Sequence, residues 1–422
     1  MQPASPSASG ASSNPASGTL FWLLLPFALA YGVSYFFRNV NAVAGPVLAQ
    51  EFSVGPGGLG FLTSVYFLAF ALAQVPLGVA LDRFGPARVN AVMLLASATG
   101  AAVFALAGDV SHLGAGRALI GLGSGAALMS AMSAAHLWVP QERRATSMGF
   151  IMVVGGIGAL TASTPVQILI MHFGWRKVFW VLCALALLVS ALVWRTRGAV
   201  QPAAASQTPR QLLAGVAEVF CSRFFWTIAV AVMLTLGTML AFQSLWAATW
   251  MRDVAGMRDR IAIGNVLFAF NLGMACAFFA SGWLGDTLER RGIAPERTLI
   301  GYIAVALAAQ TWLMLWPQTL PHLAWGVYAF GANALVLAFS ILPRRFAPAL
   351  TGRVNTALNL LAFGMAFLLQ WGIGVVLNLW PVVEGLYAVQ GYYRAWVVLV
   401  LLQGLAAIWL AFSTCRAAPQ NG

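Results

Sequence analysis

The feature that most restricts how this chain folds is a succession of long, uncharged apolar segments. A helix needs about 20 mostly apolar residues to cross the hydrocarbon of a bilayer. Barrel strands would instead alternate in polarity over about 10 residues. The sequence predicts twelve spanning helices, at residues 20–42, 58–80, 88–107, 112–136, 146–170, 175–195, 226–249, 263–285, 297–317, 321–342, 353–378 and 394–414. The expected fold class is therefore an all-α membrane protein.

Composition excludes a soluble fold. Of the 422 residues 60% are hydrophobic and 8% are charged, whereas a soluble domain carries about 25% charged residues. The net charge of +12 does not indicate nucleic acid as a partner, because the basic residues are spread over short predicted loops. Of the 23 basic residues, 15 fall in the loops and tail of one side and 6 in the loops of the other, which predicts cytoplasmic N- and C-termini in a bacterial inner membrane.

The cysteines and the short motifs favour neither a cofactor, nor a metal site, nor an enzyme. The four cysteines form no CxxC pair, and three of them lie in predicted spans or at their ends. The glycine-rich stretch at 121–125 lies inside a span and lacks the Lys-Ser/Thr of a phosphate loop. We therefore expect the lipid bilayer and a small-molecule substrate, with or without a coupling ion, as the partners.

A polar stretch divides the predicted spans into two sets of six. We interpret this stretch, residues 196–224, as a cytoplasmic linker between an N-terminal bundle at 20–195 and a C-terminal bundle at 225–415. A disordered tail at 1–19 and a short tail at 416–422 are predicted at the two ends. The halves resemble each other, because Gly78 and Asp82 recur as Gly282 and Asp286 at an offset of 204 residues. Two pseudo-symmetric six-helix bundles are the plan of a two-bundle transporter.

The loop after the second span carries the clearest motif, at Gly78, Asp82, Arg83, Gly85 and Arg88. Its pattern resembles the major facilitator superfamily, and the resemblance covers about residues 20–414. Arg117, followed by Gly121, Gly123 and Gly125, resembles that superfamily's arginine-and-glycine fourth helix. The resemblance implies a gating role for these residues and for Asp286, and a functional monomer. The alternative, judged from the residues without the resemblance, is that this loop contributes to topology and folding and has no gating role.

Arg38 is the first candidate for substrate binding, since a charge inside a span is costly and marks a functional site by default. Tyr31, Ser34 and Tyr35 precede it at spacings that place all four on one helical face. A helix ending near Arg38 would leave its side chain at the outer interface, but the helical pattern continues through Ala49. The stretch resembles the first helix of anion-transporting branches of the superfamily, which implies that Arg38 holds a phosphate or carboxylate.

Two departures from those branches concern the coupling ion. Their symporters often carry an acid before the first-helix arginine and a glutamate seven residues after the fourth-helix arginine, where this chain has Phe37 and Ser124. No acid is predicted in the middle of a span, which argues against a pump for cationic drugs. His136 is a candidate proton relay, with a packed neutral histidine as the alternative.

Other polar span residues are candidates for the cavity lining. Met239, Gln243, Trp246 and Trp250 are predicted on one helical face, and Asn271 and Asn333 come from later spans. Helix–helix hydrogen bonding is the alternative for each of them. The leading hypothesis is a secondary transporter that moves a small organic anion, a carboxylate first, by alternating access. The alternatives are efflux of hydrophobic or neutral compounds and, behind that, a metal or vitamin importer.

Overall fold

The computed structural model describes residues 17–198, 215, 217–333, 335–347 and 350–416. Nearly all of the predicted tails at 1–19 and 416–422, and the centre of the predicted linker at 196–224, lie outside the described residues. Every named element in the described chain is helical. We call the end of the molecule that holds residues 52–55 the outer end and the opposite end the inner end, after the orientation expected from the sequence.

Six spans form the first half of the chain. They are α1 (Ser17–Glu51), α2 (Pro56–Phe84), α3 (Pro86–Ala105), α4 with α5 (Val110–Ser124 and Ala126–Trp138), α6 with α7 (Gln141–Thr161 and Thr164–Phe173) and α8 (Trp175–Arg195), followed by the short turn η1 (Thr196–Gly198).

The second half repeats this plan. It comprises α10 (Arg223–Ala241), the π-turn η2 (Phe242–Trp246) and α11 (Ala247–Asp253) as one span, then α12 (Arg260–Arg290) and α13 (Pro295–Leu315). The remaining spans are α14 (Pro321–Ala332) with α15 (Leu335–Ile341) and η3 (Leu342–Arg345), then α16 (Thr351–Leu377) and α17 (Val389–Arg416).

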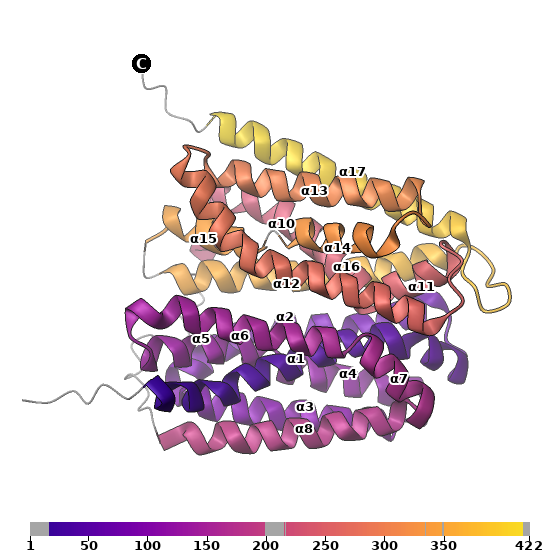
Figure 1. The fold of residues 1–422 in the computed structure, drawn as a ribbon, viewed down its shortest axis with the longest axis horizontal. Coiled ribbons are helices and arrows are strands. Elements are labelled where there is room, and N and C mark those ends of the chain that lie inside the picture. Colours follow the sequence, from indigo (N-terminus) through magenta and orange to yellow (C-terminus); the bar gives the residue numbers. More distant parts are fainter. Residues whose placement is uncertain (1–16, 199–214, 216, 334, 348–349, 417–422) are drawn as a thin grey trace, which may run out of the picture.

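Within the described residues, eleven helices are long and apolar enough to cross a membrane, and the bent pair α6–α7 makes a twelfth span. The two members of this pair meet at 42°, where Pro165 removes a backbone donor from the first turn of α7. The prediction of twelve helices in two six-helix bundles is thereby confirmed. Figure 1 shows α1–α8 on one side of the molecule and α10–α17 on the other, with their axes nearly parallel.

Glycines allow corresponding helices of the two halves to approach closely. A Cβ on Gly121 of α4 would overlap the backbone of Tyr66 in α2, and a Cβ on Gly273 of α12 would overlap the backbone of Gly326 in α14. These are the fourth and second spans of each half. Small residues at such crossings bring helix backbones into direct contact, which is how helices associate in lipid.

The first helix is longer than its predicted range of 20–42. It continues without a break to Glu51, although Pro26 and Pro46 lie inside it. Arg38 is consequently about three and a half turns from the helix end rather than at the interface.

Candidate functional site

A central cavity of about 150 Å³ lies between the two halves. From the first half it is lined by Tyr31, Ser34, Tyr35, Arg38, Phe70, Gln74, Ser124, Gly125, Leu128, Met129 and Met152. From the second half it is lined by Leu236, Met239, Leu240, Met274, Phe278, Asn333, Phe339, Asn359 and Phe363. Both bundles therefore contribute to one site, as alternating access requires.

Arg38 is the one charged residue of this lining. It is 5% exposed, and its Nε has no hydrogen-bond partner in the described chain. Its guanidinium carbon lies 4.4 Å from the ring centre of Tyr35, 5.0 Å from that of Phe363 and 5.5 Å from that of Phe70. The cation therefore contacts aromatic faces, and no carboxylate belongs to the lining.

Arg117 has a different environment. It is fully buried and does not line the cavity. Its Nη1 donates to the backbone oxygen of Phe37 at 3.0 Å, and its guanidinium lies over the ring of Tyr66 at 4.9 Å. Arg117 thus joins α4 to the turn of α1 that presents Arg38, and we interpret it as a positioning residue.

Four polar side chains of the cavity already donate to partners inside the protein. The Tyr31 hydroxyl donates to the sulfur of Met152 at 3.7 Å, and the Ser34 hydroxyl donates to the Ser124 backbone oxygen at 3.2 Å. The side-chain amide of Gln74 donates to the Phe70 oxygen at 3.2 Å, and that of Asn333 to the Met274 oxygen at 3.4 Å. Few donors remain for a ligand apart from Arg38.

Of the residues proposed from the sequence for substrate binding, the structure brings Tyr31, Tyr35, Arg38 and Asn333 together at the cavity. Gln243, Trp246 and Asn271 lie outside its lining and are buried between helices. The Gln243 amide donates to Asn271 Oδ1 at 2.8 Å, and the Asn271 amide donates to the Ala159 oxygen in the other half at 3.1 Å. These side chains form part of a packed layer at the outer side of the cavity.

The outer end is closed by further contacts between the halves. The Gly57 N–H donates to Asn378 Oδ1 at 3.1 Å, and the Thr164 hydroxyl donates to Asn265 Oδ1 at 2.9 Å. Trp246 is fully buried, and its indole N–H donates to the Gln370 oxygen at 2.9 Å. Its ring would lie 3.1 Å from a Cβ on Gly60 of α2. The described cavity is therefore shut off on the outer side.

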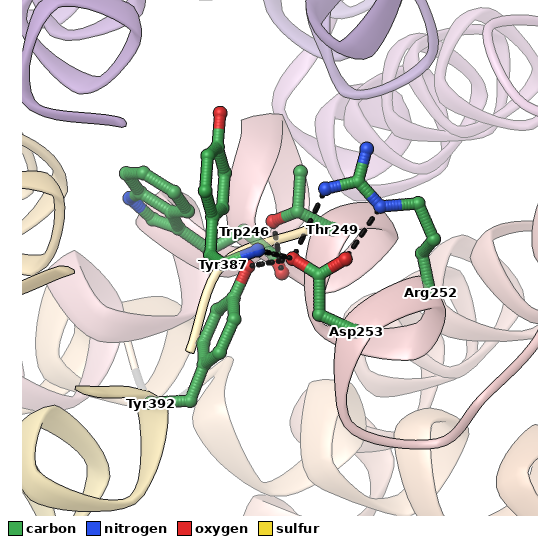
Figure 2. Close-up of polar contacts among 6 residues, drawn as sticks. All are labelled: Trp246, Thr249, Arg252, Asp253, Tyr387 and Tyr392. Carbon is green, nitrogen blue, oxygen red and sulfur yellow. Dashed lines mark hydrogen bonds and ion pairs between the residues drawn. The ribbon is translucent and has the colours of Figure 1, made fainter. Parts of the chain in front are cut away.

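Asp253 holds the connection between α16 and α17 against this outer layer (Figure 2). Its fully buried carboxylate accepts from Arg252 Nε at 2.5 Å, from the Tyr387 N–H at 3.2 Å and from the Tyr392 hydroxyl at 3.1 Å. Burial raises the pKa of Tyr387 to about 12, and its ring centre lies 6.3 Å from that of Trp246. Neither Asp253 nor Tyr387 was singled out from the sequence, because their proximity depends on the fold.

The residues proposed for gating lie at the inner end, apart from Arg117. Arg83 and Arg88 are exposed, and a Cβ on Gly78 or Gly85 would meet no atom within 4 Å. The side chain of Asp82 is outside the described part of the chain. Asp286 is exposed, while the neighbouring Glu289 pairs with Arg344 at 2.5 Å, which lowers the pKa of Glu289.

His136 is also exposed at the inner end, on the last turn of α5. Its backbone oxygen accepts from Arg144 Nη2 at 3.0 Å, and its side chain is not part of the cavity lining. Phe70 and Phe363 are the aromatic contacts of Arg38 that sequence reasoning missed. They stack at 4.1 Å across the halves.

The fold and this central cavity define a multi-pass secondary transporter. The profile of the Major Facilitator Superfamily matches residues 27–370. The chain belongs to this superfamily, and it is a transporter rather than an enzyme.

The chain is similar to several curated transporters. It is 28% identical to a probable sulfoacetate transporter of Cupriavidus necator over 40% of this chain and 39% of that protein. It is 25% identical to the hexuronate transporter of Escherichia coli K12 over 42% and 41% of the two chains. These two alignments thus span about two-fifths of the relatives' lengths. A probable L-galactonate transporter of Escherichia coli K12 is 24% identical over 71% of this chain and 69% of its own.

Solved structures show the same fold. A bacterial homologue of the lysosomal transporter Spinster, in an inward-facing conformation, gives a TM-score of 0.72 at 17% identity over 94% of this chain and 97% of its own. A peptide transporter in complex with alafosfalin gives a TM-score of 0.75 at 15% identity over 96% of each chain.

Proposed function

We propose that this transporter moves a small organic anion, with a carboxylate as the charged group, and that Arg38 binds this charge. The observation that carries the proposal is the buried guanidinium at the central cavity, whose lining supplies no acid to neutralise it. A cation in such an environment is costly unless it is paired. A bound carboxylate would supply the pair and would accept two parallel N–H bonds from the guanidinium.

The relatives support an anionic substrate. The names of three of them specify sulfoacetate, hexuronate and L-galactonate. Transport would proceed by rocking of the two halves about the cavity. Tyr31, Tyr35 and Asn333 would contact the substrate, and Gln243, Trp246 and Asn271 would belong to the outer closure rather than to the ligand.

The remaining assignments follow from the predicted orientation. We propose that the bundles at 20–195 and 225–415 move relative to each other, and that both termini lie in the cytoplasm of a bacterial cell. The loop from Gly78 to Arg88 and Asp286 would then act at the inner gate. We propose a monomer as the functional unit.

The proposal is tested by ligand-induced thermal stabilisation of the purified chain, comparing the parent with Arg38→Gln. A ligand that binds only the folded state raises the melting temperature by mass action. We expect organic carboxylates to stabilise the parent and to lose this effect in Arg38→Gln. Equal stabilisation of both proteins by the same anions would show that Arg38 does not bind the anion.

Efflux of hydrophobic compounds is the second candidate, because aromatic, aliphatic and methionine side chains make up most of the lining. A tetracenomycin C resistance and export protein of Streptomyces glaucescens is 31% identical over 44% of this chain and 35% of its own. This alternative predicts stabilisation by neutral lipophiles, unchanged in Arg38→Gln.

A further inference from the structure

We infer that the substrate is a monoanion carrying a compact apolar ring, and that sugar acids and dianions are excluded. This inference rests on the proposed function, since it takes Arg38 as the anion-binding group. It narrows the substrate class by three properties of the same cavity, namely its charge, its free hydrogen-bonding groups and its apolar surface.

The charge of the cavity fixes the charge of the ligand. Arg38 is the single ionisable cation of the lining. A ligand with one negative charge gives a neutral pair, whereas a second carboxylate would find no second cation in the lining and would face neutral groups. Burying an unpaired charge is far more costly than burying an unpaired neutral group. A dianion of the same size should therefore bind much more weakly.

The hydrogen-bonding groups disfavour a polyhydroxylated ligand. Tyr31, Ser34, Gln74 and Asn333 each donate to a partner inside the protein. The Ser124 hydroxyl is buried and has no partner in the described chain, and Asn359 is half-buried at the cavity. Even with the Tyr35 hydroxyl and the side-chain oxygens of Gln74 and Asn333, which also lie at the cavity, these groups are too few to pair both the donor and the acceptor of every hydroxyl of a sugar acid. Each hydroxyl that loses water without a replacement partner costs binding free energy.

The apolar surface next to Arg38 fits a ring. Phe70 and Phe363 stack at 4.1 Å, and both contact the guanidinium. Met129, Met152, Met239 and Met274 add flexible, polarisable surface from both halves. A dry apolar cavity of about 150 Å³ is known to hold a benzene ring. The cavity here has about that volume, so a ring with one carboxylate on Arg38 would fill it.

Two pairs of ligands test the inference on the purified full-length chain, by thermal stabilisation and by direct calorimetric titration. Benzoate and phthalate differ by one carboxylate, and cyclohexanecarboxylate and quinate differ by ring hydroxyls. We expect benzoate and cyclohexanecarboxylate to bind, and phthalate and quinate to bind at least about tenfold more weakly. Benzamide, which lacks the charge, should not bind.

Variants of α16 provide a matched control. Phe363→Leu should weaken benzoate binding by about 2- to 10-fold, because the ring loses an aromatic contact. Phe367→Leu on the same helix should leave binding unchanged, since Phe367 packs against Phe61 and Trp371 away from the cavity. The ligand series on the parent protein tests the proposed substrate class even if a variant folds poorly.

The outcomes separate the two proposals. If quinate or phthalate binds as tightly as its partner and requires Arg38, the anion function stands and the apolar monoanion class is overturned. If benzamide binds as tightly as benzoate, or if Arg38→Gln retains benzoate binding, the proposal that Arg38 binds an anionic substrate is wrong. Only the preference of the cavity for an apolar ring would then be supported.

Discussion

At the scale of single residues, the contacts of each charged side chain distinguish packing from binding. Arg117 donates to the Phe37 oxygen and lies away from the cavity, whereas Arg38 lies at the cavity wall over three aromatic rings. A guanidinium matches a carboxylate in a way that a lysine cannot, because the lysine ammonium binds as a point charge.

We therefore expect Arg38→Lys to bind benzoate about tenfold or more weakly than the parent, because it loses the bidentate contact, which is worth about 1.5–3 kcal/mol. Calorimetric titration with benzoate checks this, beside Arg38→Gln. Parent-like affinity in Arg38→Lys would show that charge alone is enough and would argue against a bidentate contact.

Asp253 allows a second prediction at this scale. Its side chain is fully buried and that of Arg252 is 19% exposed, so their ion pair is shielded from water. Asp253→Asn should destabilise the protein by about 1.5–3 kcal/mol, because hydrogen bonds to a charged group are lost. The measurement is the apparent melting temperature of the purified variant.

The matched control is Glu289→Gln, which removes an ion pair whose two side chains are 41% and 50% exposed. Exposed pairs contribute little, so this melting temperature should equal that of the parent. If both variants melt alike, the Asp253 contacts in Figure 2 do not stabilise the outer layer.

At the scale of helices, close crossings between glycine-containing segments set the spacing inside each half. A Cβ on Gly158 of α6 would overlap the Gly32 backbone of α1, whereas a Cβ on Gly149 of the same helix would meet no atom within 4 Å. The two glycines share a helix and differ only in the neighbour that they face.

Gly158→Ala should therefore destabilise the protein by about 1–3 kcal/mol, since α1 and α6 must separate. Gly149→Ala should be neutral or stabilising, because alanine is the better helix former. Thermal unfolding of both variants tests this, and an equal loss of stability would show that the α1–α6 crossing can widen freely.

The helices also show how far the sequence could be interpreted. Their number, the two halves and the α1 face with Tyr31, Tyr35 and Arg38 were predictable, because hydrophobic length and helical spacing are local properties. The predicted face of Met239 and Gln243 did not persist, since the π-turn η2 begins at Phe242 and changes the spacing. Phe70 and Phe363 could not be found, because they meet through the packing of α2 against α16.

At the scale of the whole molecule, the loop charges predict the direction of the chain across the bilayer, and a native residue can test this prediction. Cys221 is exposed and lies two residues before the start of α10, at the end we call inner. In a variant that retains only this cysteine, a membrane-impermeant maleimide should label inverted vesicles and leave intact cells unlabelled.

A cysteine at Glu384, exposed in the connection from α16 to α17, is the opposite control and should be labelled in intact cells. Labelling of Cys221 from outside would reverse the proposed orientation. It would also exchange the outer and inner closures described for the cavity.

Alternating access requires the outer contacts between the halves to break in every cycle. Gly57 of α2 and Asn378 at the end of α16 meet there across the halves. In a background without other cysteines, Gly57→Cys with Asn378→Cys should form a disulfide that locks this end. We expect oxidation to abolish anion transport in proteoliposomes and reduction to restore it, because one half can no longer rock away from the other.

Ligand binding should persist in the oxidised double variant, since the cavity itself does not include either residue. Loss of transport together with retained benzoate binding would separate movement from recognition. Transport that continues at the parental rate after complete cross-linking would mean that the outer ends of α2 and α16 stay together during the cycle. The substrate would then have to reach Arg38 by another route, past α7 and α12, where Thr164 and Asn265 form another hydrogen bond between the halves at this end.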